Sequence, residues 1–190
     1  MFQTQRDADI NIGIYKRVPI LLREDPVENP WNVSFQLMFM MNTDLTLFRT
    51  NPIGDALPLY EAKLLQHFDH RLASYDKRPE GSQDSELPRL DLKEKNDPRR
   101  SPIPRYWVDR TEVDARLARR GWDKFWLLGW RDIARSTDQR TMIASFLPRL
   151  GASRTLPLML TTSSRVDCLY SNLASFILDY AIRQKVAGTH

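Results

Sequence analysis

The 190-residue chain is long enough for one domain of ordinary size, and its 42% hydrophobic and 27% charged residues match a globular protein rather than a disordered one. No apolar run approaches the roughly 18 residues that a membrane helix needs, and the N-terminus lacks a signal-peptide pattern, so we expect no membrane partner. The single cysteine, Cys168, excludes an internal disulfide and fits a core residue of a cytoplasmic protein.

Positive charge is unevenly distributed along the chain. The net charge is +4, but residues 93–154 carry 15 Lys and Arg against 8 Asp and Glu, which leaves the rest slightly acidic. Such a concentration suits a polyanion partner, because each neutralised phosphate releases condensed counterions. A solvated surface laced with salt bridges explains the charge alone equally well.

The first 56 residues are predicted to be a connecting segment. Ile10, Ile14 and Val18 recur at four-residue spacing, which predicts a short amphipathic helix over residues 6–18, stopped by Pro19. Residues 33–41 form an apolar run that fits a buried strand or a helix, and periodicity does not separate the two.

The middle of the chain changes character twice. Residues 57–75 lack a sustained helical stripe, which favours extended structure. Residues 76–104 are rich in Pro, Asp, Lys, Ser and Arg and almost devoid of aliphatic side chains, so we expect a long, low-order, mobile loop. Residues 112–120 predict a short charged helix ended by Gly121.

The C-terminal part carries the clearest pattern. Strands are expected at residues 125–133, 141–146 and 156–161, with polar, basic segments between them. Apolar residues then recur at helical spacing, which predicts one amphipathic C-terminal helix that packs on the sheet. They are Val166, Leu169, Tyr170, Leu173, Phe176, Ile177 and Tyr180. Ser163 or Ser164 would cap this helix and Gly188 would end it. Residues 57–190 are therefore predicted to form an α+β domain, with a small, mainly antiparallel sheet backed by that helix.

Several catalytic or metal-binding interpretations are weaker than a structural one. His67, Asp69 and His70 offer three metal ligands, but only His190 and Cys168 remain to complete a zinc site, so nucleic-acid or structural roles are favoured for His70 and Arg71. Acidic residues followed by lysine at residues 86–93 resemble the spacing of metal-dependent nucleases, yet they lie in the low-order segment rather than on a rigid strand.

Motifs for other chemistry are absent from the sequence. It holds no nucleophile elbow and no glycine-rich phosphate loop. Residues 29–31 (NPW) differ from the Asn/Asp-Pro-Pro-aromatic tetrapeptide of amino-methyltransferases, because Trp31 replaces the second proline, and we interpret them as a turn. Four of the five tryptophans lie between residues 107 and 130 among basic residues, a pattern typical of base stacking, although for each single Trp a core position is favoured.

Residues 131–141 (RDIARSTDQRT) are the best candidate for contact with DNA. This polar loop between two expected strands carries three arginines, hydroxyls and a glutamine, which are donors to phosphates and to base edges. Arg135 and Arg140 are the first choices, whereas Arg131 could instead pair with Asp132 or Asp138. The predicted DNA-contacting residues are Arg131, Arg135, Ser136, Thr137, Gln139, Arg140 and Thr141 in the loop, with His70, Arg71, Arg183 and Lys185 outside it.

An ordered set of motifs resembles a known family. The motifs are LYEAK (59–63), FDHR (68–71), PRYW (104–107), the loop with its preceding Gly-Trp (129–141) and the C-terminal stretch 172–190, preceded by NPW (29–31) and LFRT (47–50). In this order they resemble the C-terminal half of large adenine-specific DNA methyltransferases of type II and IIG restriction–modification systems and related phage-defence methylases.

The resemblance implies a target-recognition region, similar to the TaqI-type specificity domain, that docks on double-stranded DNA. Its second partner would be the catalytic methyltransferase domain of the same polypeptide, which would bind AdoMet. Because the cofactor motif and the Asn-Pro-Pro-aromatic motif of the family are missing, we expect a fragment that binds no cofactor and is inactive alone. The alternative is a structural or protein-interaction domain of a defence-system methylase, and a nuclease is a distant third.

Overall fold

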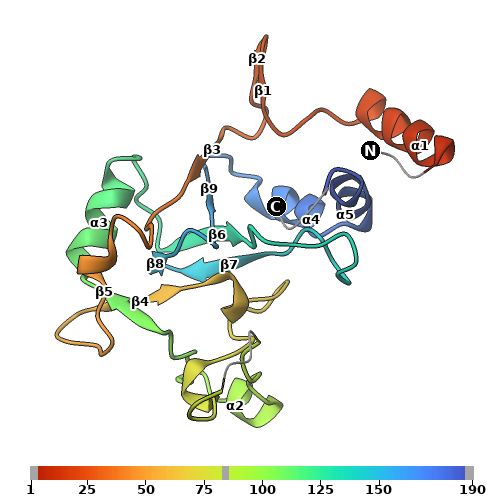
Figure 1. Ribbon diagram of the computed structural model, residues 1–190. Coiled ribbons are helices and arrows are strands. Elements are labelled where there is room, and N and C mark those ends of the chain that lie inside the picture. The colour runs from red at the N-terminus through yellow and green to blue at the C-terminus, as the bar shows by residue number, and fades with distance from the viewer. Residues whose placement is uncertain (1–3, 83–85, 187–190) are drawn as a thin grey trace.

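The computed structural model of this chain describes residues 4–82 and 86–186 and confirms a mixed α+β fold (Figure 1). The helices are α1 (Gln5–Arg17), α2 (Leu92–Asn96), α3 (Arg110–Ala118), α4 (Val166–Leu173) and α5 (Phe176–Arg183). The strands are β1 (Arg23–Glu24), β2 (Val27–Glu28), β3 (Val33–Gln36), β4 (Leu57–Tyr60), β5 (Tyr106–Val108), β6 (Trp126–Trp130), β7 (Ala144–Pro148), β8 (Gly151–Ala152) and β9 (Leu158–Thr161).

Two small sheets form the centre of the fold. The larger has the order β3-β9-β6-β7 with every pair antiparallel, and β6 pairs with β7 from Trp126↔Pro148 to Trp130↔Ala144. The smaller has the order β5-β4-β8, in which β4 and β8 are parallel. The predicted mainly antiparallel sheet is confirmed, and the three strands expected in the C-terminal part correspond to β6, β7 and β9.

Both faces of the larger sheet carry buried side chains, and successive residues of a strand contribute to opposite faces. In β6, Leu127 belongs to the core that joins the two sheets, and Leu128 belongs to the core beneath α4. Met159 of β9 and Leu169 of α4 extend the second core. Each fully buried leucine contributes roughly 1.5–3 kcal/mol, so the two cores explain why short strands hold together.

The predicted single C-terminal helix is two helices, which corrects the sequence interpretation. α4 ends at Leu173, and Ser175 starts α5 by accepting a hydrogen bond from the Leu178 N–H at 3.1 Å. A serine oxygen that caps a helix start satisfies a backbone N–H that would otherwise lack a partner. The expected caps at Ser163 and Ser164 are wrong, since the residue before α4 is Arg165 and makes no side-chain cap. The expected end at Gly188 lies outside the described residues.

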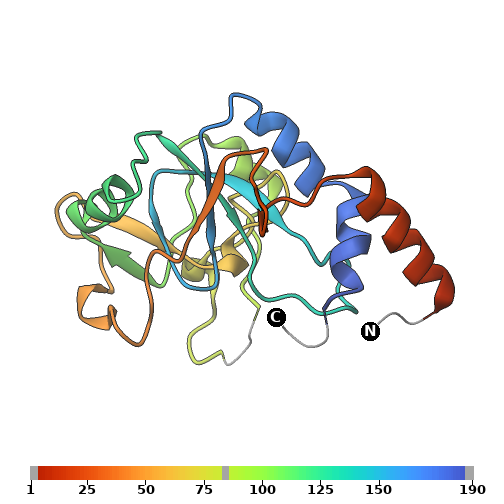
Figure 2. The ribbon, with the colours of Figure 1, turned by 90° about the horizontal axis from the view of Figure 1, so that it is seen from above.

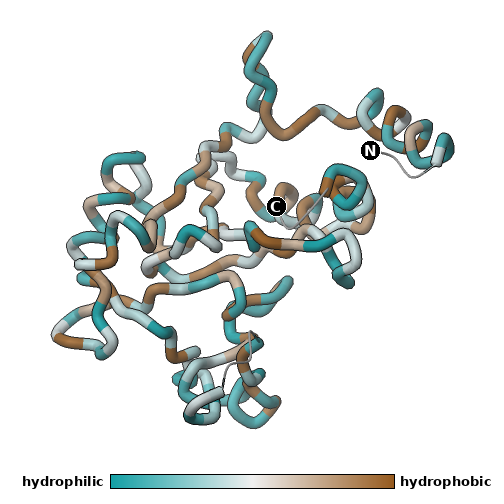
Figure 3. Tube along the Cα trace, viewed as in Figure 1, coloured by the Kyte–Doolittle hydropathy of each residue, from teal (hydrophilic) through white to brown (hydrophobic). Residues whose placement is uncertain are grey.

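The N-terminal helix is confirmed as α1. Thr4 and Asp7 form a reciprocal capping box at its start, and the Asp7 carboxylate also accepts a 2.6 Å hydrogen bond from the Tyr180 hydroxyl of α5. α1 therefore lies against α5, at the end of the molecule opposite α3 (Figure 2). Apolar residues recur among hydrophilic ones along it (Figure 3).

Three other local predictions can be compared with the structure. Of the ambiguous run 33–41, residues 33–36 are a strand, β3. Of the expected extended stretch 57–75, only β4 is a strand, and it is followed by short 3-10 turns. The helix expected at residues 112–120 is α3, and Gly121 follows it with φ +65°, a conformation that glycine adopts without a steric cost.

Residues 76–104 hold more structure than their composition suggests. They contain α2, and Leu87 and Leu90 are buried, so the premise that this segment lacks apolar anchors is wrong. Elsewhere the segment is mostly hydrophilic and is tied by ion pairs such as Lys77–Glu94 at 2.5 Å (Figure 3). Its mobility stays a prediction.

Candidate nucleic-acid interface

The basic loop lies between β6 and β7, at the end of the larger sheet nearest α5 (Figure 1). Its tip is a tight turn in which the Arg135 N–H donates to the Asp138 carboxylate at 2.8 Å and the Asp138 N–H donates back to the Arg135 carbonyl at 3.1 Å. Four predicted DNA-contacting side chains are exposed on this tip, and none makes a hydrogen bond or ion pair within the part of the chain that the structure describes. They are Arg135, Ser136, Thr137 and Gln139.

The side chain of Arg183, on α5, supports the backbone of this tip. Its guanidinium donates to the Ser136 carbonyl, to the Asp138 carbonyl at 2.8 Å and to the Gln139 carbonyl at 3.1 Å. A planar guanidinium presents several donors in a rigid fork, so one side chain holds three carbonyls of the loop backbone. Arg183 was predicted to contact DNA, and the structure places it in this supporting position instead.

Asp179 of α5 is buried, and its carboxylate joins the end of the loop to two arginines. Its carboxylate accepts hydrogen bonds from the Thr141 N–H at 2.7 Å and the Met142 N–H at 2.9 Å, and it pairs with Arg183 at 3.1 Å and Arg140 at 3.4 Å. Burial alone would raise the pKa of Asp179, but the two backbone N–H groups and then the two arginines outweigh burial and hold that pKa below its usual range.

Sequence reasoning missed Asp179 because the helix containing it was examined for its apolar stripe alone. A signal was present, since Asp179 and Arg183 stand four residues apart, a spacing at which opposite charges meet on a helix. Thr141, predicted to reach DNA, is buried, and its hydroxyl donates to the Asp179 carbonyl at 3.0 Å.

Arg140, the first choice for a base reader, points into the fold. Its guanidinium donates to the Ala174 carbonyl at 2.6 Å and lies 4.6 Å from the ring centroid of Phe176. It therefore covers the break between α4 and α5. Arg131 pairs with neither aspartate that was considered for it but donates to the Leu65 carbonyl, and burial lowers its pKa.

Replacement of Arg140 by alanine should lower stability rather than affinity. Asp179 would lose one of its two cations and the Ala174 carbonyl would lose a donor, so we expect a loss of about 1–3 kcal/mol in the free energy of unfolding. Urea unfolding measures this loss, and the folded fraction should bind duplex DNA as the wild type does. A variant with unchanged stability and weaker binding to one sequence alone would show instead that Arg140 reads a base.

The remaining predicted contacts lie outside the loop and have different surroundings. Arg71 donates to the carbonyls of Lys95 (2.7 Å), Asp97 (3.0 Å) and Arg100 (3.1 Å), which anchors the segment around α2. His70 is half-buried, and burial followed by the nearby Arg71 charge lowers its pKa. Lys185 is exposed, with its ammonium 4.8 Å from the ring centroid of Tyr15.

Two of the clustered tryptophans, Trp122 and Trp126, belong to the hydrophobic core. Trp122 is buried, and its ring meets the Trp126 ring edge-on at 4.9 Å between centroids. Trp126 in turn meets Phe146 at 5.3 Å. These rings are half-buried or buried, which confirms the core interpretation for Trp122 and leaves little free face on Trp126.

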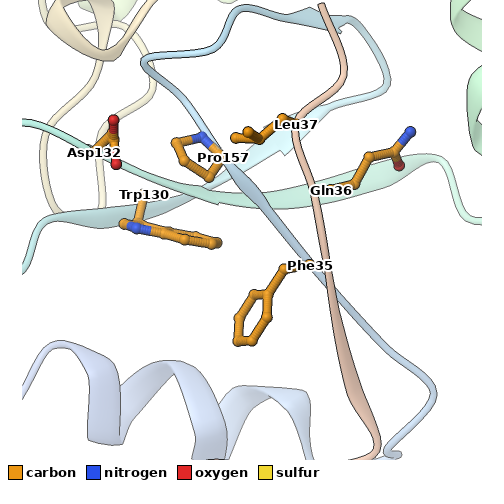
Figure 4. Close-up of a pocket in the computed structure, with 6 residues that line it drawn as sticks. All are labelled: Phe35, Gln36, Leu37, Trp130, Asp132 and Pro157. Carbon is orange, nitrogen blue, oxygen red and sulfur yellow. The ribbon is translucent and has the colours of Figure 1, made fainter.

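A shallow pocket of about 290 Å³ opens beside β3 and β6 (Figure 4). Its lining is mostly apolar, and the rings of Phe35 and Trp130 meet edge-on at 5.5 Å. Figure 4 shows both rings on the side of the sheet that faces a helix. Asp132 is the one carboxylate of the lining, and the six lining residues include no histidine, cysteine or hydroxyl nucleophile, so they do not assemble acid–base chemistry.

Residues 4–82 and 86–186 contain no group of three His, Cys, Asp or Glu side chains placed to hold a metal ion, and His67 uses its ring Nε2 in a 2.6 Å hydrogen bond with the Met142 carbonyl. In the same residues, no helix is both long enough and apolar enough to cross a bilayer.

Comparison with family models, with curated proteins and with solved structures finds no match for this chain.

Proposed function

We propose that this chain is a module that binds double-stranded DNA through the loop between β6 and β7. The observation that carries the proposal is the construction of that loop. Arg183 and Asp179 hold its backbone through hydrogen bonds. The side chains of Arg135, Ser136, Thr137 and Gln139 are exposed and make no hydrogen bond or ion pair within the described residues. Rigid support of exposed donor side chains is what phosphate contact and base readout require.

The charge distribution supports a polyanion as the partner. Residues 93–154, which include the loop, have a surplus of seven positive charges. Several of these charges are consumed inside the fold, as Arg131 and Arg140 are, so the proposal depends on the exposed cations that remain. Arg135 at the tip is one of them, and Lys185, which follows α5 and lies outside residues 93–154, is a further exposed cation.

The resemblance to adenine-specific DNA methyltransferases supports a more specific role. In this proposal the chain recognises the target sequence in a restriction–modification or phage-defence system, and a catalytic domain of the same polypeptide binds AdoMet and transfers the methyl group. The motifs 59–63, 68–71 and 129–141 carry the resemblance. We place such a protein in the cytoplasm, where bacterial DNA lies.

A salt titration with Arg135→Ala tests the proposal. Wild-type affinity for a labelled duplex should fall steeply with salt, and Arg135→Ala should flatten the slope of log affinity against log salt by about one unit if Arg135 meets a phosphate. Arg119→Ala is the matched control, because Arg119 is also exposed but ends α3 at the opposite end of the molecule. Wild-type binding that is absent or insensitive to salt would contradict the proposal.

A protein-interaction role is the second candidate, and α1 favours it. Ile10, Ile12, Tyr15 and Val18 of this region are between 41% and 53% exposed, although apolar side chains at helical spacing normally pack on a neighbour. This surface would suit the catalytic domain or another subunit of a defence system. The salt titration separates the two candidates, because a surface that binds protein alone gives no salt-dependent duplex binding.

A further inference from the structure

Phe68 occupies a turn that an L-amino acid with a bulky side chain rarely forms. Its φ is +59°, and among the described non-glycine residues only Asn32 shares a positive φ. The turn is closed by reciprocal hydrogen bonds, from the Gln66 N–H to the Asp69 carbonyl at 2.8 Å and from the Asp69 N–H to the Gln66 carbonyl at 3.1 Å. Glycine and asparagine adopt this left-handed conformation readily, whereas phenylalanine does so against steric repulsion.

The surrounding structure fixes this turn rigidly. The Phe68 N–H donates to the Tyr170 hydroxyl at 2.8 Å, and that hydroxyl donates to the Ala144 carbonyl of β7 at 3.1 Å. The His67 ring is joined to the Met142 carbonyl at 2.6 Å. Strained conformations persist only where the environment over-determines them, and they concentrate at functional sites.

The phenyl ring itself gains little from the fold. It is 76% exposed, and its aromatic contacts are an edge-on approach to Tyr170 at 5.2 Å and a tilted one to His67 at 5.8 Å. A ring so exposed contributes little hydrophobic burial, and a turn of this shape would be better served by glycine. Neither the backbone nor the core therefore accounts for an aromatic residue at this position.

The turn lies beside the basic loop. Arg131 at the start of the loop donates to the Leu65 carbonyl, and Met142 at its end accepts from His67, so residues 65–68 run along the base of the loop. Burial lowers the pKa of His67, and the positive charge of nearby Arg140 lowers it further. An exposed aromatic ring on a fixed turn thus lies at the base of the loop whose tip carries the exposed donor side chains.

We propose that Phe68 stacks on a nucleobase of bound duplex DNA. This inference rests on the proposed function and adds its aromatic component. A phenyl ring offers a flat apolar face that matches the face of any base, and nucleic-acid-binding proteins stack aromatic side chains on unpaired bases. The donors of the loop would then hold the strand while the ring engages a base.

Duplex affinity of a set of Phe68 variants tests the inference. Phe68→Gly keeps the left-handed turn and removes the ring, and it should weaken binding roughly 5- to 150-fold, as the loss of one stacked base does. Its slope of log affinity against log salt should equal that of the wild type, because stacking neutralises no phosphate. Phe68→Trp should keep or improve affinity, and Phe68→Leu should lose it, since leucine has no aromatic face.

Thermal unfolding of the same variants excludes a structural explanation. Phe68→Gly should melt at or above the wild-type temperature because it relieves the strained φ, and Phe125→Ala, which removes an 88% exposed ring at the far end of β6, should leave affinity unchanged. Full affinity in Phe68→Gly, or full affinity in Phe68→Leu, would overturn the stacking inference while leaving DNA binding intact. A wild-type chain without salt-dependent binding would overturn both.

Discussion

Replacing Asp179 with alanine should lower the free energy of unfolding by about 3–5 kcal/mol, the cost of removing one partner from a buried ionic network. The change leaves the N–H groups of Thr141 and Met142 without their acceptor and leaves Arg140 and Arg183 without the carboxylate with which both pair. Because Arg183 holds the loop backbone, the exposed tip should also lose its fixed shape. Urea unfolding measures the first effect, and hydrogen exchange at residues 135–142 measures the second.

Because of the same carboxylate, the free energy of unfolding should decrease at acid pH. An unfolded aspartate titrates near pH 3.9, and the pKa of Asp179 in the folded chain lies lower. The stabilisation from its ionised form is therefore complete above about pH 5 and is lost as pH falls through the folded pKa. Asp179→Asn cannot ionise, so its unfolding free energy should fall less steeply below about pH 5 than that of the wild type.

Asp55→Asn is the control for both measurements. Asp55 is 69% exposed and lies 3.5 Å from Arg110, an arrangement that contributes about 0–1 kcal/mol. Its replacement should change neither the stability at neutral pH nor the slope in acid by a measurable amount. Equal behaviour of Asp179→Ala and Asp55→Asn would show that α5 does not organise the loop.

Replacing Phe39 with alanine should cost about 3–5 kcal/mol, the range for truncation of a fully buried aromatic ring. Phe39 has no exposed surface and lies in the core that joins the two sheets. The guanidinium of Arg116 lies 4.2 Å from its ring centroid, and the Phe48 ring meets it edge-on at 6.1 Å. The cavity would loosen both sheets together, since the same core contains residues of β4 and of β6.

Phe125→Ala provides the comparison, since it removes the same side chain from an exposed position. We expect a change within about 0.5 kcal/mol for this surface substitution. Chemical denaturation of the two variants under identical conditions gives the difference directly. Similar losses in both would mean that the packing between the two sheets is not the core of the fold.

Elements with a local signal could be predicted from the sequence. The helix at the N-terminus and the strands β6, β7 and β9 were found because periodicity and stop signals are properties of neighbouring residues. The break between α4 and α5 was missed, because the apolar spacing continues through Ser175 and only the cap geometry shows that the helix restarts there. The two buried leucines of residues 76–104 were underrated, since only four aliphatic residues in the whole segment are a weak signal.

The candidate site was predicted as a region rather than as individual contacts. The loop between β6 and β7 could be located from its residue types, but Arg131, Arg140, Arg183 and Thr141 could not be assigned their places inside the fold. The residue type alone determines the charge of an arginine and the length of its side chain. Which carbonyl or carboxylate it meets depends on segments tens of residues away.

The sequence by itself determined where charge is concentrated along the chain and the mixed character of its elements. It specified a basic central region, an α+β pattern and a polar loop between two apolar strands, because these follow from residue types and short-range spacing. Only the tertiary structure decided which cations remain available, since Asp179, far along the chain from Thr141, reaches the loop only when α5 packs beside it. The exposure and left-handed turn of Phe68 were likewise set by Tyr170 and Met142, whose hydrogen bonds exist only in the folded chain.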